Sequence, residues 1–332
     1  MNNINSKAMP APPNIIHIIL AGFDSITNHL ILILFPMLLD LLLWFGPRLS
    51  IKNLVKSMLN TMAKMPGANS PEMIKLMEIN QTIWESMGEH FNLISVLRTY
   101  PVGIPSLMVS IQPINNPLNT TASIQINSIQ AVAGLWIILT VFGLSLGAFY
   151  FWSVAQAAVV GEISWSKGIL KWPWLALQVC LLALLWLAIL VAMSVPGSCI
   201  LTVLAAGGES FARIGLLIIL GIIMWLLFPL IFSSHGIFVF QRTMWESVKQ
   251  SVRMTRYTFP STALFFFIIL MLGEGLDMLW RIPGETSWLT MIGLLGHGFV
   301  ASGILASTFI YYRDATSWVD QVVQRIKLSS MA

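Results

Sequence analysis

The sequence predicts an all-α protein: a polytopic transmembrane helical bundle of six spans, with an amphipathic cytoplasmic helix and a small helical extracytoplasmic insert. Two observations support this prediction. Only 10% of the 332 residues are charged, whereas a soluble domain carries about 25%. The second observation is the length of the uncharged stretches, since a helix of about 20 apolar residues crosses the hydrocarbon core of a bilayer. Five stretches of 17 to 37 residues contain no Asp, Glu, Lys or Arg, and most of them reach that length: 129–161, 172–208, 214–241, 257–273 and 286–312.

The first hydrophobic stretch, 15–45, follows an N-terminal tail, 1–14, and is interrupted by polar residues. It is too long for one untilted span, and it predicts an interfacial helix over 15–23 followed by a first span over 30–45. Asp24 or Ser25 is expected to cap the second helix, and Pro36 is expected to kink it. No small-residue cleavage site follows, so the sequence favours a retained span over a signal peptide.

The rest of the chain predicts a five-span bundle over 129–312 and a C-terminal tail over 313–332. The orientation follows from the lysines and arginines in the short loops, ten on one side and two on the other. By the positive-inside rule, both termini are predicted to be cytoplasmic, with the protein in the plasma membrane. The predicted spans of the bundle are 129–155, 174–196, 214–238, 261–280 and 288–312.

The one sizeable hydrophilic region, 46–128, is predicted to be an extracytoplasmic insert. Apolar residues at helical spacing predict an amphipathic helix over 51–62, and Ser70-Pro71-Glu72 opens a second helix that runs to Met87. Four prolines within 99–119 predict an irregular, extended segment. About 80 residues with two one-faced helices make no large core alone, so the insert is expected to pack on the membrane surface, on the outer ends of the spans or on a partner.

The strongest local signal is the segment 241–256, QRTMWESVKQSVRMTR. At 100° per residue, four cations and Glu246 share a narrow arc, while Trp245, Val248 and Val252 form a separate apolar stripe. A helix of this kind is typical of an interfacial anchor with its cations toward lipid headgroups. The alternatives are a docking surface for a cytoplasmic partner, such as a coupling helix, or a lipid-phosphate site. The predicted contact residues for membrane lipids or a protein partner are Arg242, Lys249, Arg253 and Arg256.

Ionisable residues deep in predicted spans form a second group of candidates: Asp40, His235 and His297. Such groups are costly in hydrocarbon and point to function or to paired interhelical contacts. We expect His297, or a Ser or Thr of a neighbouring span, to be the partner of Asp40. A proton or ion path is one interpretation, and satisfied interhelical hydrogen bonds are the favoured one.

Small residues recur four apart at Gly143 and Gly147, and again at Gly298, Ser302 and Ala306. Such stripes permit close helix approach. Intramolecular packing is the favoured interpretation, and homodimerisation is the alternative.

Several function classes find no support in the sequence. It contains no Gly-x-Ser-x-Gly, no His-Glu-x-x-His, no Walker loop and no Cys-x-x-Cys. Five scattered histidines and two cysteines fit no metal-site spacing. The basic residues form no long solvated tract of the kind that binds nucleic acid. We therefore expect no catalytic residues, no cofactor, no metal and no nucleic-acid partner.

Three segments carry a resemblance to a known family: 246–251 (ESVKQS) with Phe259-Pro260 before a span, 309–314 (FIYYRD) closing the last span, and 35–44 (FPMLLDLLLW) in the first. Together they resemble bacterial six-span membrane proteins related to the membrane domain of some glycerophosphoryl diester phosphodiesterases. The resemblance covers all six spans in outline. The sequence contains no soluble phosphodiesterase domain, so the resemblance does not imply that activity.

Two functional hypotheses follow. The first is a non-enzymatic accessory or scaffold subunit that contacts a partner or lipid through the basic interfacial helix. The alternative is a transporter subunit, such as a permease of the ABC exporter type, which also has a first span followed by an external domain and a cytoplasmic helix that contacts an ATPase.

Overall fold

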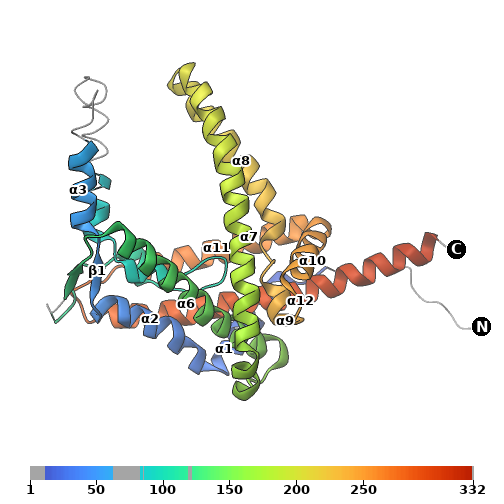
Figure 1. Ribbon diagram of the computed structural model, residues 1–332. Coiled ribbons are helices and arrows are strands. Elements are labelled where there is room, and N and C mark those ends of the chain that lie inside the picture. Colours follow the sequence, from blue (N-terminus) through green and yellow to red (C-terminus); the bar gives the residue numbers. More distant parts are fainter. Residues whose placement is uncertain (1–11, 63–82, 85, 119–121, 331–332) are drawn as a thin grey trace, which may run out of the picture. The chain divides into compact units, whose positions relative to one another are not determined.

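The computed structural model describes residues 12–62, 83–84, 86–118 and 122–330 (Figure 1). Within them the chain is mainly helical, with two short strands, which confirms the predicted all-α class. The longer helices are α1 (Ile15–Thr27), α2 (Leu34–Phe45), α3 (Lys52–Met62), α6 (Ile129–Ala155), α7 (Trp165–Ala206), α8 (Glu209–Leu227), α10 (Met244–Tyr257), α11 (Phe259–Trp280) and α12 (Thr290–Ser330). The short elements are η1 (Leu30–Ile33), β1 (Arg48–Ser50), η2 (Leu93–Leu97), α5 (Met108–Ile111), β2 (Ser123–Gln125), η3 (Gln156–Val160), η4 (Phe228–Leu230) and α9 (His235–Val239).

Five of the described helices are long and apolar enough to cross a membrane, which makes this a multi-pass membrane protein. A bent pair, Ile15–Thr27 with Leu30–Phe45, adds a sixth crossing if it counts as one span. The five are Ile129–Val160, Trp165–Ala206, Ser210–Val239, Phe259–Trp280 and Thr290–Leu328.

The first hydrophobic stretch breaks after Thr27, where α1 ends, which is later than predicted. Helix α1 begins at the N-cap Asn14 and runs through Asp24 and Ser25, so the expected cap at these residues is wrong. The Ser25 hydroxyl instead donates to the carbonyl of Ala21, one helical turn earlier. Pro36 lies in the first turn of α2, where a missing N–H costs no hydrogen bond. The segment changes from the 3₁₀ helix η1 to α2 two residues before Pro36, and the kink at Pro36 stays a prediction.

Helices α7 and α8 form an antiparallel hairpin (Figure 1). Helix α7 has 42 residues and a length of about 63 Å, and it continues through Pro196, where the predicted span ended. Gly208, with a φ of 112°, forms the turn into α8. The return helix ends before Pro229, and the residues up to Ser234 form η4 and turns before α9 begins. The predicted span 214–238 is thus a broken helix.

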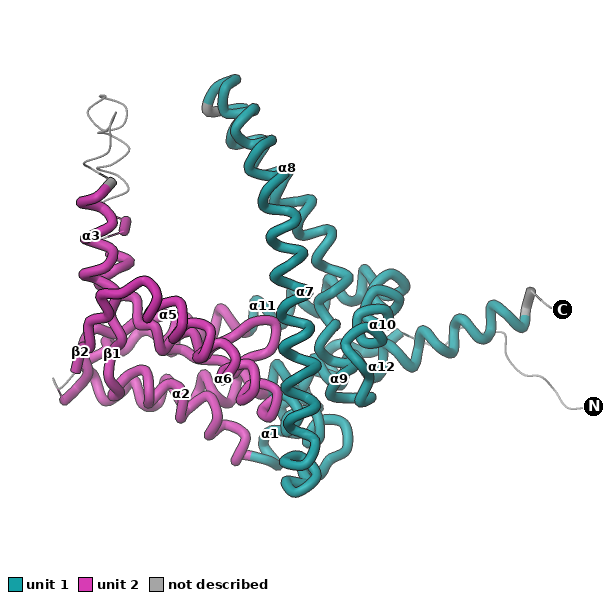
Figure 2. The backbone as a smooth tube through the Cα atoms, viewed as in Figure 1, with its two compact units in different colours: residues 1–29, 151–272, 303–332 teal, residues 30–150, 273–302 magenta. Residues whose placement is uncertain are grey.

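The chain divides into two compact units (Figure 2). Unit 1 comprises residues 1–29, 151–272 and 303–332. Its core gathers residues of α1, α10, α11 and α12 around Phe232, which precedes α9. The ring of Tyr311 stacks on that of Phe265 at 4.4 Å between centroids. The predicted C-terminal tail is helical as far as Ser330, and Ala315 and Val319 are buried in this core.

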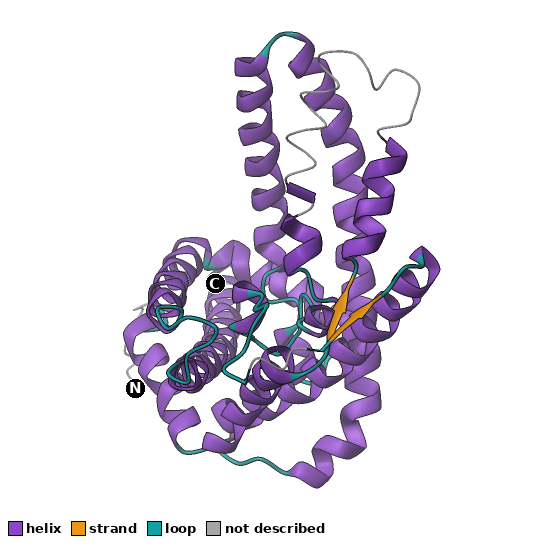
Figure 3. Cartoon of the chain, turned by 90° about the vertical axis from the view of Figure 1, so that its left-hand side faces the viewer, coloured by secondary structure: helices purple, strands orange, loops and turns teal. Residues whose placement is uncertain are grey.

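Unit 2 comprises residues 30–150 and 273–302 and contains the described part of the insert. Strands β1 and β2 pair in parallel, Arg48 opposite Ser123, and bring the two ends of the insert together (Figure 3). Helix α3 confirms the predicted amphipathic helix over 51–62. Most of the predicted second helix, which Ser70-Pro71-Glu72 opens, lies outside the described residues, and 83–84 and 86–90 are helical.

The small-residue stripe of α6 packs against the insert. A Cβ at Gly143 would lie 2.6 Å from the carbonyl oxygen of Leu97, and one at Gly147 would lie 2.8 Å from the Cα of Gly103. On α12, Gly298 approaches Ile33 and Pro36, and the hydroxyls of Ser302 and Tyr150 are 2.9 Å apart. Both stripes therefore serve packing within the chain.

Polar contacts tie helix α3 and the strands to the segment at 89–92. The guanidinium of Arg48 donates to the carbonyls of Glu89 and His90, and burial lowers the pKa of this guanidinium. The Lys52 ammonium lies 2.6 Å from the Glu89 carboxylate and lowers the pKa of that carboxyl. Since both Lys52 and Glu89 are half-exposed, this ion pair contributes little to stability.

Candidate functional site

Helix α10 begins at Met244, three residues later than the sequence-predicted helix. Thr243 is its N-cap and forms a capping box with Glu246, whose carboxylate accepts from the Thr243 N–H at 3.1 Å. Gln241 takes a left-handed conformation with a φ of 52°, which sets the turn before the helix. Arg242 therefore precedes the helix, and its guanidinium lies over the Phe240 ring at 4.9 Å. The prediction that Arg242 shares the cationic arc is wrong for this reason.

The face of α10 that packs into unit 1 is small and polar. The hydroxyls of Ser247 and Ser251 donate to the carbonyls of Ser233 and Pro229, at 2.6 and 2.7 Å. These carbonyls belong to the broken segment between α8 and α9, where regular helical hydrogen bonds are lost. A non-helical backbone at membrane depth needs such donors, because lipid supplies none. The polar face of α10 therefore stabilises the break.

Contacts from α7 hold the start of α10. The side-chain oxygen of Gln178 accepts from the N–H of Met244 at 2.8 Å, and the Lys171 ammonium donates to Gln241 at 2.7 Å. Gly236 of α9 lies against Ser247, where an added Cβ would clash with the hydroxyl oxygen. Contacts with α7 and α9 thus hold α10 in unit 1.

The opposite face of α10 carries the predicted cations. Lys249, Arg253 and Arg256 are exposed, as the sequence predicts. Arg253 lies 3.1 Å from Asp320 of α12, and both side chains remain more than 40% exposed. Lys249 and Arg256 form no ion pair with any residue in the described part of the chain. Three cations outnumber the two carboxylates on this face, Glu246 of the capping box and Asp320, so the face carries a net positive charge.

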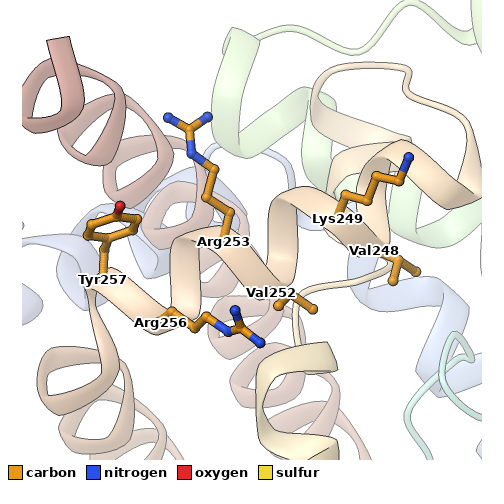
Figure 4. A pocket seen from close by; sticks show the side chains of 6 residues that line it. All are labelled: Val248, Lys249, Val252, Arg253, Arg256 and Tyr257. Atoms are coloured by element: carbon orange, nitrogen blue, oxygen red, sulfur yellow. The ribbon is translucent and has the colours of Figure 1, made fainter. Parts of the chain in front are cut away.

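The cations border a shallow hollow of about 510 Å³ on the outer side of α10 (Figure 4). Its floor is apolar, and the guanidinium of Arg256 extends toward Val252 (Figure 4). The six lining residues all belong to α10, so no second element closes the hollow: Val248, Lys249, Val252, Arg253, Arg256 and Tyr257. We call this face the α10 surface.

Asp40 lies in α2 and is fully buried in unit 2. Its carboxylate accepts from the Ser106 hydroxyl at 2.5 Å and from the N–H groups of Met108 and Leu107 at 3.0 and 3.2 Å. The expected partner was His297 or a hydroxyl of a neighbouring span. The partner is a serine hydroxyl, as one alternative expected, but it belongs to the insert and not to a neighbouring span. The Asp40 carboxylate also accepts from the first N–H groups of helix α5, which have no acceptor within that helix. Asp40 thus anchors the insert to α2.

The two histidines are held by different partners in different units. Nδ1 of His297 lies 2.7 Å from the carboxylate of Asp277 on α11, and Arg281 approaches the same carboxylate at 3.8 Å. Nε2 of His235 lies 2.9 Å from the hydroxyl of Thr308 on α12. Each geometry fits the interhelical hydrogen bond that the sequence favours for these residues.

Sequence reasoning missed the buried polar face of α10 and the residues that hold Asp40. The signal for the first was present, since Ser247, Ser251, Thr255 and Thr258 recur at helical spacing opposite the cations. No signal pointed to Ser106, because the irregular segment around it has no periodicity. Among the described residues, no three His, Cys, Asp or Glu side chains converge in an arrangement that suits a metal ion.

Fold and site together define a multi-pass α-helical membrane protein with an exposed cationic helix between two of its candidate spans. Comparisons with protein-family models, with curated proteins and with solved structures found no match for this chain. The resemblance to the membrane domain of glycerophosphoryl diester phosphodiesterases therefore stays a prediction from short sequence motifs.

Proposed function

We propose that this protein is a non-enzymatic accessory or scaffold subunit of the membrane, and that the α10 surface is its contact toward a partner or lipid headgroups. One observation supports this most directly. The polar face of α10 is held by hydrogen bonds to unit 1, so its cations are presented outward on a rigid support. Exposed cations that are unpaired or weakly paired contribute little to folding, and their arrangement on one fixed face is typical of a surface that binds anions.

The proposal includes an orientation in the plasma membrane with both termini, and α10, on the cytoplasmic side. The ten-to-two distribution of short-loop cations supports it. We expect a cysteine at Ser57→Cys in α3, in a background without Cys180 and Cys199, to react with an impermeant maleimide in intact cells. A cysteine at Ser166→Cys, exposed at the start of α7, is expected to react only after lysis. The reverse pattern would invert the orientation.

The partner is tested by purification of the full-length chain in mild detergent, with identification of the proteins that accompany it. We expect a membrane subunit to co-purify, and the triple change Lys249→Gln, Arg253→Gln and Arg256→Gln to reduce its recovery at least tenfold. The matched control neutralises three exposed cations elsewhere: Lys56→Gln, Lys167→Gln and Arg281→Gln. A co-purifying nucleotide-binding subunit would instead support the transporter permease. Isolation of the chain alone, with unchanged membrane behaviour of the triple variant, would refute a partner at this surface.

A further inference from the structure

The position of α10 along the chain places it at a membrane interface. A candidate span, Ser210–Val239, ends five residues before α10 begins, and another, Phe259–Trp280, starts two residues after α10 ends. A short helix between two consecutive spans has both ends on the same side of the bilayer. Arg256 and Tyr257 therefore lie within about one helical turn of the hydrocarbon boundary.

The exposed apolar residues around α10 are those expected at this depth. Trp245, Tyr257 and Phe259 are 59%, 52% and 49% exposed. Trp and Tyr concentrate at membrane interfaces, because an apolar body and a polar N–H or O–H suit the headgroup level, and the apolar ring of Phe259 begins the adjoining candidate span. Val248 and Val252 are half-buried in the floor of the hollow. The α10 surface thus combines cations with an apolar floor at the level of lipid headgroups.

We propose that the α10 surface binds the phosphate group of an anionic phospholipid through Lys249, Arg253 and Arg256. The lipid's glycerol and upper acyl region would lie over Val248 and Val252. The charges are complementary, because two of the cations are unpaired and the third has only a half-exposed partner. Guanidinium groups bind phosphate oxygens in pairs of parallel hydrogen bonds, and an ammonium adds a point charge. This assignment rests on the proposed function of the α10 surface and names its ligand.

Asp320 gives the site an internal competitor. Its carboxylate holds Arg253 at 3.1 Å, so a phosphate that binds Arg253 must share or replace this ion pair. The pair is solvent-exposed and therefore weak, which permits the exchange. Removing the Asp320 charge is expected to strengthen lipid binding, an effect that a merely structural ion pair would not produce.

The test titrates the full-length protein in detergent with short-chain phosphatidylglycerol, short-chain phosphatidylcholine and inorganic phosphate, with binding measured by calorimetry. Each cation near an anionic lipid changes the affinity about fivefold. We expect Lys249→Gln with Arg256→Gln to weaken phosphatidylglycerol binding about 30-fold, and Asp320→Asn to strengthen it about fivefold. The control pair Lys56→Gln with Lys167→Gln removes the same charge and is expected to leave binding unchanged.

Three results would overturn the assignment. Equal losses in the two double variants would mean a non-specific charge effect. Phosphate binding as tight as phosphatidylglycerol binding would indicate an anion site without a lipid, and equal binding of the two lipids would exclude charge recognition.

If lipid binding fails while a protein co-purifies in a manner that depends on the α10 cations, the proposed function stands without this ligand. If lipid binding succeeds and no protein co-purifies, the surface is a lipid site and the partner subunit is excluded.

Discussion

Replacement of Asp40 by alanine is expected to lower the free energy of unfolding by about 3–5 kcal/mol. The change leaves three buried donors without an acceptor: the hydroxyl of Ser106 and the N–H groups of Leu107 and Met108. Each unsatisfied donor costs about 1–3 kcal/mol. Removal of a fully buried carboxylate also relieves its own desolvation cost, so the loss is smaller than the largest sum.

Thermal unfolding in detergent and proteolysis of segment 99–118 measure this effect. Because Asp40 holds the insert, we expect cleavage there to accelerate together with the loss of thermal stability. The matched control is Asp24→Ala, the same chemical change at an exposed site in α1, with an expected effect below about 0.5 kcal/mol. Asp40→Asn retains an oxygen acceptor and is expected to fall between the two. Identical behaviour of Asp40→Ala and Asp24→Ala would show that Asp40 does not anchor the insert.

Replacement of Gly147 by valine is expected to cost about 3 kcal/mol or more, near the upper end of overpacking effects. A Cβ at this position would lie 2.8 Å from the Cα and 3.1 Å from the nitrogen of Gly103. These are backbone atoms, so no rotation of a side chain relieves the clash. We expect the insert to separate locally from α6, with a lower thermal midpoint and faster proteolysis around residues 99–103.

The same helix supplies the control. A Cβ added at Gly134 of α6 would meet no atom within 4 Å, and Gly134→Val is expected to be neutral or to stabilise by a few tenths of a kcal/mol. If Gly134→Val destabilised as much as Gly147→Val, the close approach to the insert would not be the cause. A shift of Gly147→Val from dimer to monomer without faster proteolysis would instead support the homodimer interpretation of the stripe.

Most of the fold was predictable because its signals are local. Apolar length marks a span wherever it occurs, so 129–155 and 261–280 nearly coincide with α6 and α11. The cationic arc of Lys249, Arg253 and Arg256 also follows from helical spacing alone. A local signal can still be missed. Thr243 and Glu246 form a capping box, so the helix begins at Met244 and not at Gln241, and Arg242 lies outside it.

The sequence by itself determined the class of protein, the approximate spans and the cationic face of α10, since each depends on residues close together along the chain. Only the tertiary structure decided the partners: Ser106 lies 66 residues from Asp40, and Pro229 lies 22 residues before Ser251. Helical periodicity indicates which residues share one face of a helix, but not which residues that face contacts. A buried polar group requires a hydrogen-bond partner, but its own position in the sequence does not indicate where in the chain that partner lies. The partner is determined only when folding brings the two residues together.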